Sequence, residues 1–254
     1  MPFEPRFSHA ADAFDRYRPD YPSALYDRIF AQIPESHRLR AMDLGAGTGS
    51  VSDHLAARFR EVIAVEPDAA MAAKIAERLP SVSIRRVTAE ECAQPPGSVD
   101  LITIANALHW MDAPRVLANA RLWLRPDALL AVFDRPLPKA GASIDAITLS
   151  ELRGPWKSHR DPRLKRDLIW QDQVRAAPGL AVIEEASFSN IIPMTAADYA
   201  GFWRSTSYGS AYARTLPDPE AYWKDLEARF VAVAGHAAIP VDFSPTLILS
   251  RKNA

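Results

Sequence analysis

A glycine-rich turn between two apolar segments constrains the fold of this chain more than any other feature. Residues 41 to 44 form a short, mostly apolar run that predicts a buried strand, and a helix is expected from about residue 49. The turn between them contains Gly45, Gly47 and Gly49. Glycine has no Cβ atom, so a ligand can approach the main chain there. A second predicted strand, residues 62 to 65, ends at Glu66, about 20 residues after the glycines. At this spacing a carboxylate can bind ribose hydroxyls.

The spacing of the glycines separates this turn from the dinucleotide fingerprint. That fingerprint reads G-x-G-x-x-G, whereas this chain has G-x-G-x-G with Asp43 two residues before the first glycine. The arrangement resembles the nucleoside-binding loop of class I S-adenosylmethionine-dependent methyltransferases. The resemblance implies S-adenosyl-L-methionine as cofactor. The residues that we assign to cofactor binding are Arg18, Tyr21, Asp43, Gly45, Ala46, Gly47, Glu66, Pro67, Met71, Ala89, Glu90 and Asn106.

The resemblance gives several of these residues particular roles. Glu66 would bind both ribose hydroxyls, with Pro67 and Met71 beside the adenine, although Met71 also fits the core face of a helix. Asp43 would lie under the turn, orient its amides and indirectly support the methionyl amine. Many family members have an Asp where this chain has Thr88, so contact with the adenine amino group would fall to Glu90 or to a backbone carbonyl.

A second motif follows the fourth predicted strand, at residues 99 to 104. The run Ala107-Leu108-His109-Trp110 resembles a small-molecule subgroup that includes trans-aconitate-type carboxyl methyltransferases. His109 would face the transferring methyl and is the candidate catalytic residue, because imidazole can accept a proton near neutral pH. A lone histidine can equally line the site or support the structure. A carboxylate acceptor would need no base, whereas a phenol, an amine or a ring nitrogen would.

Two further segments extend this resemblance toward the ends of the chain. Residues 17 to 22 resemble the subgroup's segment that folds over the cofactor, so Arg18 could pair with the methionyl carboxylate. We expect residues 1 to 22 to act as a lid. Residues 203 to 208 are similar to an Arg-Thr-Trp-Ser run of many relatives, with the Trp displaced. The candidate substrate residues are Tyr17, Trp110, Trp156, His159, Arg160, Arg204 and Tyr208.

Alternating strand and helix patterns predict an α/β fold with a doubly wound, mostly parallel, seven-stranded sheet. We expect an N-terminal lid and helix at 1–35, a cofactor-binding core at 36–136, and the remaining core strands with helical cap insertions at 137–254. The insertions cover about 137–178 and 194–236. Within them, residues 143 to 153 and 161 to 176 read as helices, and residues 241 to 250 read as a last strand. Nearer the N-terminus, Ser23 and Asp68 are the candidate N-caps of the helices that follow them.

Composition excludes several classes of protein. The 254 residues include 48% apolar and 24% charged residues and have a net charge of −1, so no basic excess favours a nucleic acid or an anionic membrane as partner. The N-terminus does not resemble a signal peptide. The single cysteine, Cys92, excludes an intrachain disulfide and a cysteine-built zinc site. We expect no metal, a cytoplasmic monomer or homodimer, and a small-molecule methyl acceptor as partner.

Two rival functions remain at this point. A NAD-dependent oxidoreductase is disfavoured by the glycine spacing and by the absence of a Tyr-x-x-x-Lys pair from the sequence. A non-catalytic, cofactor-binding regulatory protein fits the same motifs, and only a turnover assay distinguishes it from an enzyme.

Overall fold

The computed structural model describes residues 7–162 and 170–253. Its centre is a sheet of seven strands in the order β3-β2-β1-β4-β5-β9-β6, in which β9 runs antiparallel to both of its neighbours. The strands are β1 (Arg40–Leu44), β2 (Glu61–Val65), β3 (Ser83–Arg85), β4 (Val99–Ala105), β5 (Leu124–Asp134), β6 (Leu180–Ser187) and β9 (Thr246–Lys252). Met42 of β1 aligns with Ile63 of β2 on one side and with Ile102 of β4 on the other. The predicted fold class is confirmed.

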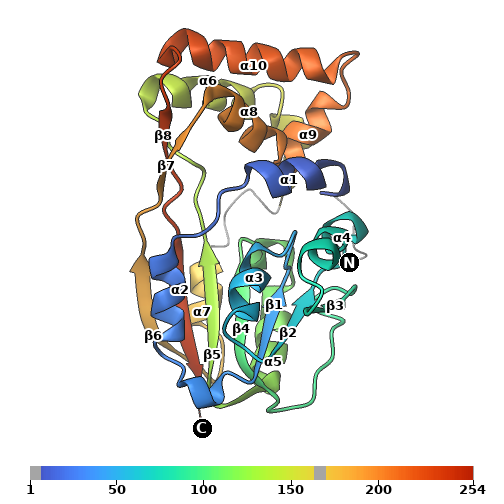
Figure 1. Ribbon diagram of the computed structural model, residues 1–254, viewed down its shortest axis with the longest axis vertical. Helices are drawn as coiled ribbons and strands as arrows, with labels where there is room; N and C mark the ends of the chain where they lie inside the picture. The colour runs from blue at the N-terminus through green and yellow to red at the C-terminus, as the bar shows by residue number, and fades with distance from the viewer. Residues whose placement is uncertain (1–6, 163–169, 254) are drawn as a thin grey trace.

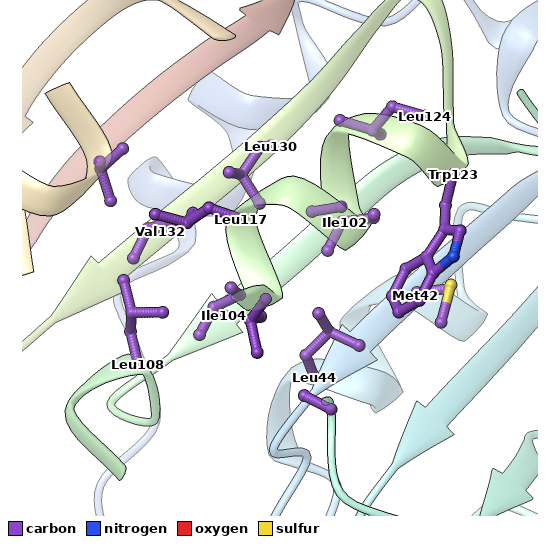
Figure 2. Close-up of a cluster of buried hydrophobic side chains, with 14 of the residues drawn as sticks. Met42, Leu44, Ile102, Ile104, Leu108, Leu117, Trp123, Leu124, Leu130 and Val132 are labelled. Atoms are coloured by element: carbon purple, nitrogen blue, oxygen red, sulfur yellow. The ribbon is translucent and has the colours of Figure 1, made fainter. Parts of the chain in front are cut away.

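Helices cover both faces of this sheet because its central strands are apolar on both sides. Successive side chains of a strand point to opposite faces, so Met42 and Leu44 join one core cluster while Ala41 joins the other. Figure 2 shows the first cluster, where Leu117 of one helix lies over these strands. The helices on this face are α5 (Ala113–Trp123) and α7 (Trp170–Arg175). Those on the other face are α2 (Ser23–Phe30), α3 (Ser50–Ala56) and α4 (Ala69–Arg78).

Helix starts follow local side-chain chemistry. Asp68 caps α4 as predicted, since its Oδ1 accepts hydrogen bonds from the amides of Ala70 and Met71 at 2.9 and 3.3 Å. Asp112 caps α5 in the same way. Ser23 is the first residue of α2 rather than its cap, a position that Pro22 takes.

Above the carboxyl edge of the sheet lies a cap of four helices (Figure 1). These helices are α6 (Ala142–Arg153), α8 (Ala196–Arg204), α9 (Ser207–Ala213) and α10 (Pro219–Ala234). An antiparallel pair, β7 (Ile191–Met194) and β8 (Ile239–Asp242), joins the cap to the sheet. A third cluster fills the cap with aromatic side chains, among them Trp156, Trp203 and Trp223. The short helix α1 (Ala11–Tyr17) lies between the cap and the sheet.

The structure corrects several sequence predictions. The last predicted strand, 241 to 250, is two strands, β8 and β9, because residues 243–245 leave the ladder and the chain passes from the two-stranded sheet to the seven-stranded one. Helix α7 packs against α5 and β6, so it belongs to the sheet core and not to the cap. Part of the helix predicted at 161–176 lies outside the described residues. The short helices α1 and α9 and the strand β7 were not predicted.

Among residues 7–162 and 170–253, no helix is long and apolar enough to cross a membrane.

Candidate cofactor and substrate site

The glycine turn is fixed to the neighbouring strand by its own backbone. The amides of Gly45 and Ala46 donate to the carbonyl of Val65, at the end of β2, at 2.8 and 3.1 Å. Gly45, Gly47 and Gly49 have φ angles of +73°, +58° and +89°. L-residues with a side chain rarely adopt these values, so the turn needs its glycines for its shape.

Glu66 closes the turn from the end of β2. Its Oε2 accepts a hydrogen bond from the amide of Gly47 at 2.8 Å, and its Oε1 accepts one from the amide of Asp68 at 2.9 Å. The residue is only 8% exposed, and burial raises the pKa of its carboxyl to about 7 against the two amide hydrogen bonds. Each carboxylate oxygen can accept a second hydrogen bond, so both remain able to bind hydroxyls of a ligand.

Asp43 supports the turn indirectly. Its oxygens accept hydrogen bonds from the hydroxyls of Ser52 at 2.7 Å and Thr103 at 2.9 Å, so it ties β1 to the first turn of α3 and to β4. This carboxylate was predicted to orient the amides of the glycine turn. In the structure it instead contacts the hydroxyls of Ser52 and Thr103. Burial raises the pKa of Asp43 to about 6, although both hydroxyls favour the ionised form.

Gly45 allows the turn to meet the loop after β4. A Cβ at this position would lie 2.7 Å from the Cβ of Ala107 and 2.9 Å from the Cε of Met111. At Gly47 a Cβ would lie 3.6 Å from the ring of Phe14, which belongs to α1. The turn is thus enclosed by the loop 106–112 on one side and by the N-terminal segment on another.

The residues expected beside the adenine follow β2 and β3: Pro67 lies in the loop after β2, Met71 in the first turn of α4, and Ala89 in the loop after β3. Met71 and Ala89 are buried, and Pro67 is half-buried. The carboxylate of Glu90 accepts a hydrogen bond from the amide of Asp112 at 2.7 Å. Glu90 therefore holds the loop after β4, a role that the sequence did not predict.

The segment before α2 is bound to the body of the protein by polar contacts. The hydroxyl of Ser8 donates to Asp68 Oδ2 at 2.6 Å, and Lys74 and Arg78 of α4 pair with two acids of α1, Asp12 at 2.6 Å and Asp15 at 3.1 Å. These contacts hold α1 over the glycine turn.

Arg18 and Tyr21 lie where this segment passes under the cap. The Nε of Arg18 donates to the hydroxyl of Ser205 at 2.8 Å, and its guanidinium lies 4.9 Å from the ring centroid of Phe202. Burial, and then the charge of Arg135, lower the pKa of Arg18 to about 10. Tyr21 is buried with the guanidinium of Arg135 4.1 Å from its ring centroid.

The loop after β4 is strained at its first residue and brings His109 to the end of β5. Asn106 has a φ of +54°, and its Oδ1 accepts a hydrogen bond from the amide of Arg135 at 2.9 Å. The Nδ1 of His109 lies 3.3 Å from Oδ2 of Asp134. Asp134 was not among the predicted site residues. The signal that could have found it is an acid at the last position of a buried strand.

The predicted substrate residues separate into two groups. Trp110 stays at the edge of the site, in edge-to-face contact with Phe7. Tyr17 packs against α8, where a Cβ on Gly201 would lie 2.5 Å from its ring. The guanidinium of Arg160 lies 5.8 Å from the ring centroid of Tyr208, and its buried Nε has no hydrogen-bond partner among the described residues.

The others serve the cap itself. Trp156 is fully buried against Trp203, with ring centroids 5.4 Å apart, and Tyr208 packs on it at 5.7 Å. His159 lies edge-on to Tyr212. Arg204, a candidate substrate residue, forms two hydrogen bonds with Glu220, at 2.8 and 2.6 Å, on the exposed side of α8, so in this structure its guanidinium is paired within the cap.

Comparison with known proteins identifies the class. Residues 41–127 match the family model described as a methyltransferase domain. The chain is 29% identical over 255 residues to a provisionally assigned methyltransferase of Dictyostelium discoideum, covering 98% of this chain and 96% of that protein. It is 39% identical over 127 residues to a trans-aconitate 2-methyltransferase of Deinococcus radiodurans, covering 48% of this chain and 47% of that protein. A solved structure of a provisionally assigned type II methyltransferase from Anaeromyxobacter dehalogenans has 26% identity and a TM-score of 0.63, and covers 93% of this chain and 97% of that one.

The fold, the glycine turn and these matches define a nucleoside-binding α/β enzyme. Residues 41–127 are a methyltransferase domain, and the fold and the relatives are those of S-adenosylmethionine-dependent methyltransferases, so the cofactor is S-adenosyl-L-methionine.

Proposed function

We propose that this enzyme methylates a small molecule held between the carboxyl edge of the sheet and the helical cap. The observation that carries the proposal is the junction of β1 and β2, where Glu66 lies 2.8 Å from the amide of Gly47 with hydrogen-bonding capacity left on both oxygens. A buried carboxylate beside a glycine turn fits a ribose with two adjacent hydroxyls. The cap above this edge and the net charge of −1 favour a small acceptor over a nucleic acid.

The chain's own residues can hold the two ends of the cofactor. Glu66 would accept from the ribose hydroxyls, and Met71 and Ala89 would lie against the adenine. Arg18 would turn from Ser205 toward the methionyl carboxylate, because a guanidinium binds a carboxylate more strongly than a hydroxyl. Tyr21 would close the same end of the site.

The reaction would be an in-line displacement. When bound, S-adenosylmethionine supplies a methyl group on a positively charged sulfur. The enzyme's contribution is to hold the acceptor atom opposite that sulfur and to exclude water, and such positioning can supply most of the rate acceleration. Helix α1 lies over the glycine turn, where it would shield the reacting centre from solvent.

The test is turnover of the purified enzyme with S-adenosylmethionine and a panel of small carboxylic acids, phenols and nitrogen heterocycles. We expect S-adenosylhomocysteine to form at a rate that depends on one class of acceptor. Tight binding of S-adenosylhomocysteine without turnover of any acceptor would instead favour a regulatory, non-catalytic protein.

A further inference from the structure

A half-buried histidine and a buried acid meet at the carboxyl ends of β4 and β5. The Nδ1 of His109 lies 3.3 Å from Oδ2 of Asp134, with the two side chains 17% and 8% exposed. Neither His109 Nδ1 nor Asp134 Oδ1 has a hydrogen-bond partner among the described residues. In unliganded enzymes the hydrogen bonds of catalytic groups are often long or poorly aligned and shorten when substrate binds. A buried carboxylate oxygen without a hydrogen-bond partner costs free energy of folding, so Asp134 is expected to have a function at this position.

The pair fixes which nitrogen of His109 is available. A carboxylate can only accept, so its nearness to Nδ1 favours the tautomer that carries the proton on Nδ1. Nε2 then holds the free lone pair and is the nitrogen that can accept a proton. The loop that carries His109 is fixed at both ends, by Asn106 on β5 and by Glu90 on the amide of Asp112.

One positive charge belongs to the residue next to the acid. Arg135 follows Asp134 directly in the chain, is buried, and donates from its guanidinium to the carbonyl of Pro19 at 2.8 Å. Since Arg18 is assigned to the methionyl carboxylate, Arg135 is left to stabilise an oxygen that gains negative charge in this site.

We propose that His109 is a general base positioned by Asp134, and that the acceptor is a phenolic or enolic hydroxyl. This inference rests on the proposed function and names the acceptor class of the same site. His109 is the catalytic residue. Asp134 is a positioning residue that acts through the imidazole.

The step balances without another reactant. The acceptor's O–H bond breaks and its proton moves to Nε2 of His109, while the oxygen forms a bond to the methyl carbon. The C–S bond breaks, and its electron pair stays on sulfur as neutral S-adenosylhomocysteine. Asp134 stabilises the imidazolium that results, which releases its proton to solvent after the product leaves.

Among oxygen acceptors, the pKa of the hydroxyl or carboxyl group decides which class of acceptor needs this base. A carboxylic acid is already ionised at neutral pH and needs no base. A phenol has a pKa near 10, about 3.5 units above that of free imidazole, so an imidazole can take its proton as the methyl is transferred. Water and aliphatic alcohols are far weaker acids than phenols, so they lie beyond the reach of this base.

The first experiment needs no acceptor. Nitrogen-15 NMR of histidine-labelled enzyme, saturated with S-adenosylhomocysteine, reports the tautomer of each imidazole. We expect His109 as the Nδ1–H tautomer in the wild-type enzyme. In Asp134→Asn we expect a mixture of the two tautomers, because the new amide group can donate as well as accept a hydrogen bond. The matched control is Asp100→Asn, which removes another buried acid, one that pairs with Arg125 at 2.6 Å, and it should leave the tautomer of His109 unchanged. A proton on Nε2 in the wild-type enzyme, or an unchanged tautomer in Asp134→Asn, would overturn the dyad.

The second experiment follows turnover against pH with matched phenols and benzoic acids. We expect phenols to be methylated, with His109→Ala lowering kcat by about a hundredfold or more and leaving S-adenosylhomocysteine affinity unchanged. In Asp134→Asn, kcat should fall while the KM for the phenol changes little, because Asp134 acts through the imidazole and does not touch the acceptor. Wild-type turnover restricted to carboxylic acids, or wild-type kcat for phenols in either variant, would overturn the inference. If no acceptor of any class turns over, the proposed function fails, and the NMR result still decides whether the dyad exists.

Discussion

The cofactor edge of the sheet and the helical cap are built by different interactions. At the edge, short hydrogen bonds join residues that are close in the sequence, such as Gly47 to Glu66 and Ser52 to Asp43. In the cap, large aromatic side chains from distant segments pack on one another, as Trp156 does on Trp203. Polar groups at the edge keep the capacity to bind a ligand, whereas the rings of the cap are used up in packing. Residues predicted to bind a ligand are therefore better placed to do so at the edge than in the cap.

The largest effect should follow from emptying the centre of the cap. Trp156 is fully buried, so Trp156→Ala should lower the free energy of unfolding by about 3–5 kcal/mol, through lost burial and a residual cavity. Chemical denaturation measures the loss, and calorimetry should show nearly unchanged affinity for S-adenosylhomocysteine. The control is Trp123→Ala, which empties a buried position in the core of the sheet and should lower the free energy of unfolding by a similar amount. A large loss of cofactor affinity in folded Trp156→Ala would show that the two regions are not separable.

Gly45→Ala should act on the edge alone. The new Cβ meets Ala107 at 2.7 Å at a φ of +73°, so both strain and a clash distort the turn. Gly97→Ala is the matched control, because Gly97 has a φ of +62° with open space around it. Both variants should lose about 1–2 kcal/mol of stability from the backbone conformation. Only Gly45→Ala should also lose cofactor affinity, which titration calorimetry measures; equal affinities in the two variants would remove the turn from the cofactor site.

Removing the Glu66 carboxylate should weaken cofactor binding by about tenfold or more, the loss of charge-assisted hydrogen bonds to ribose. Calorimetry of Glu66→Ala measures this affinity. Unchanged affinity in that variant would separate Glu66 from the ribose.

The same carboxylate gives the stability of the free protein a pH dependence. Its folded pKa, about 7, lies above the usual value of 4.5, so its contribution is complete below pH 4.5 and is lost as the pH rises through 7. The loss is at most about 3 kcal/mol. Glu66→Gln should flatten the fall in stability between about pH 4.5 and 7, measured by urea denaturation, while the fall from Asp43, between about pH 3.8 and 6, remains. Cofactor affinity of the wild type should change in the opposite sense and increase with pH, because the ionised acid accepts from the ribose.

The smallest effect concerns the segment that joins the two regions. Helix α1 is held to α4 by surface ion pairs such as Asp12–Lys74, which are weak and screened by salt. Hydrogen exchange should show greater protection of residues 10–22 when S-adenosylhomocysteine is bound, if the segment is a lid. Equal protection with and without the cofactor would make it a fixed part of the body.

The sequence determined the sheet because each central strand carries its signal locally. An apolar run marks each of β1, β2, β4 and β5 in the sequence. The spacing between the three glycines and the acid after β2 predicts the turn and its ligand. Asp68 was identified as a helix cap for the same reason, since a cap needs only the next three residues.

Tertiary structure decided the contacts between distant segments. Nothing local to Asp134 shows that it meets His109, because that pairing depends on β4 and β5 being neighbours in the sheet. Likewise, Arg204 could face inward or outward from the sequence alone, and the packing of α8 on α10 turned it toward Glu220. The sequence by itself therefore determined the sheet, its glycine turn and the class of cofactor. Only folding decided which polar side chains remain free for chemistry, because a partner far along the chain has no signature in the local pattern.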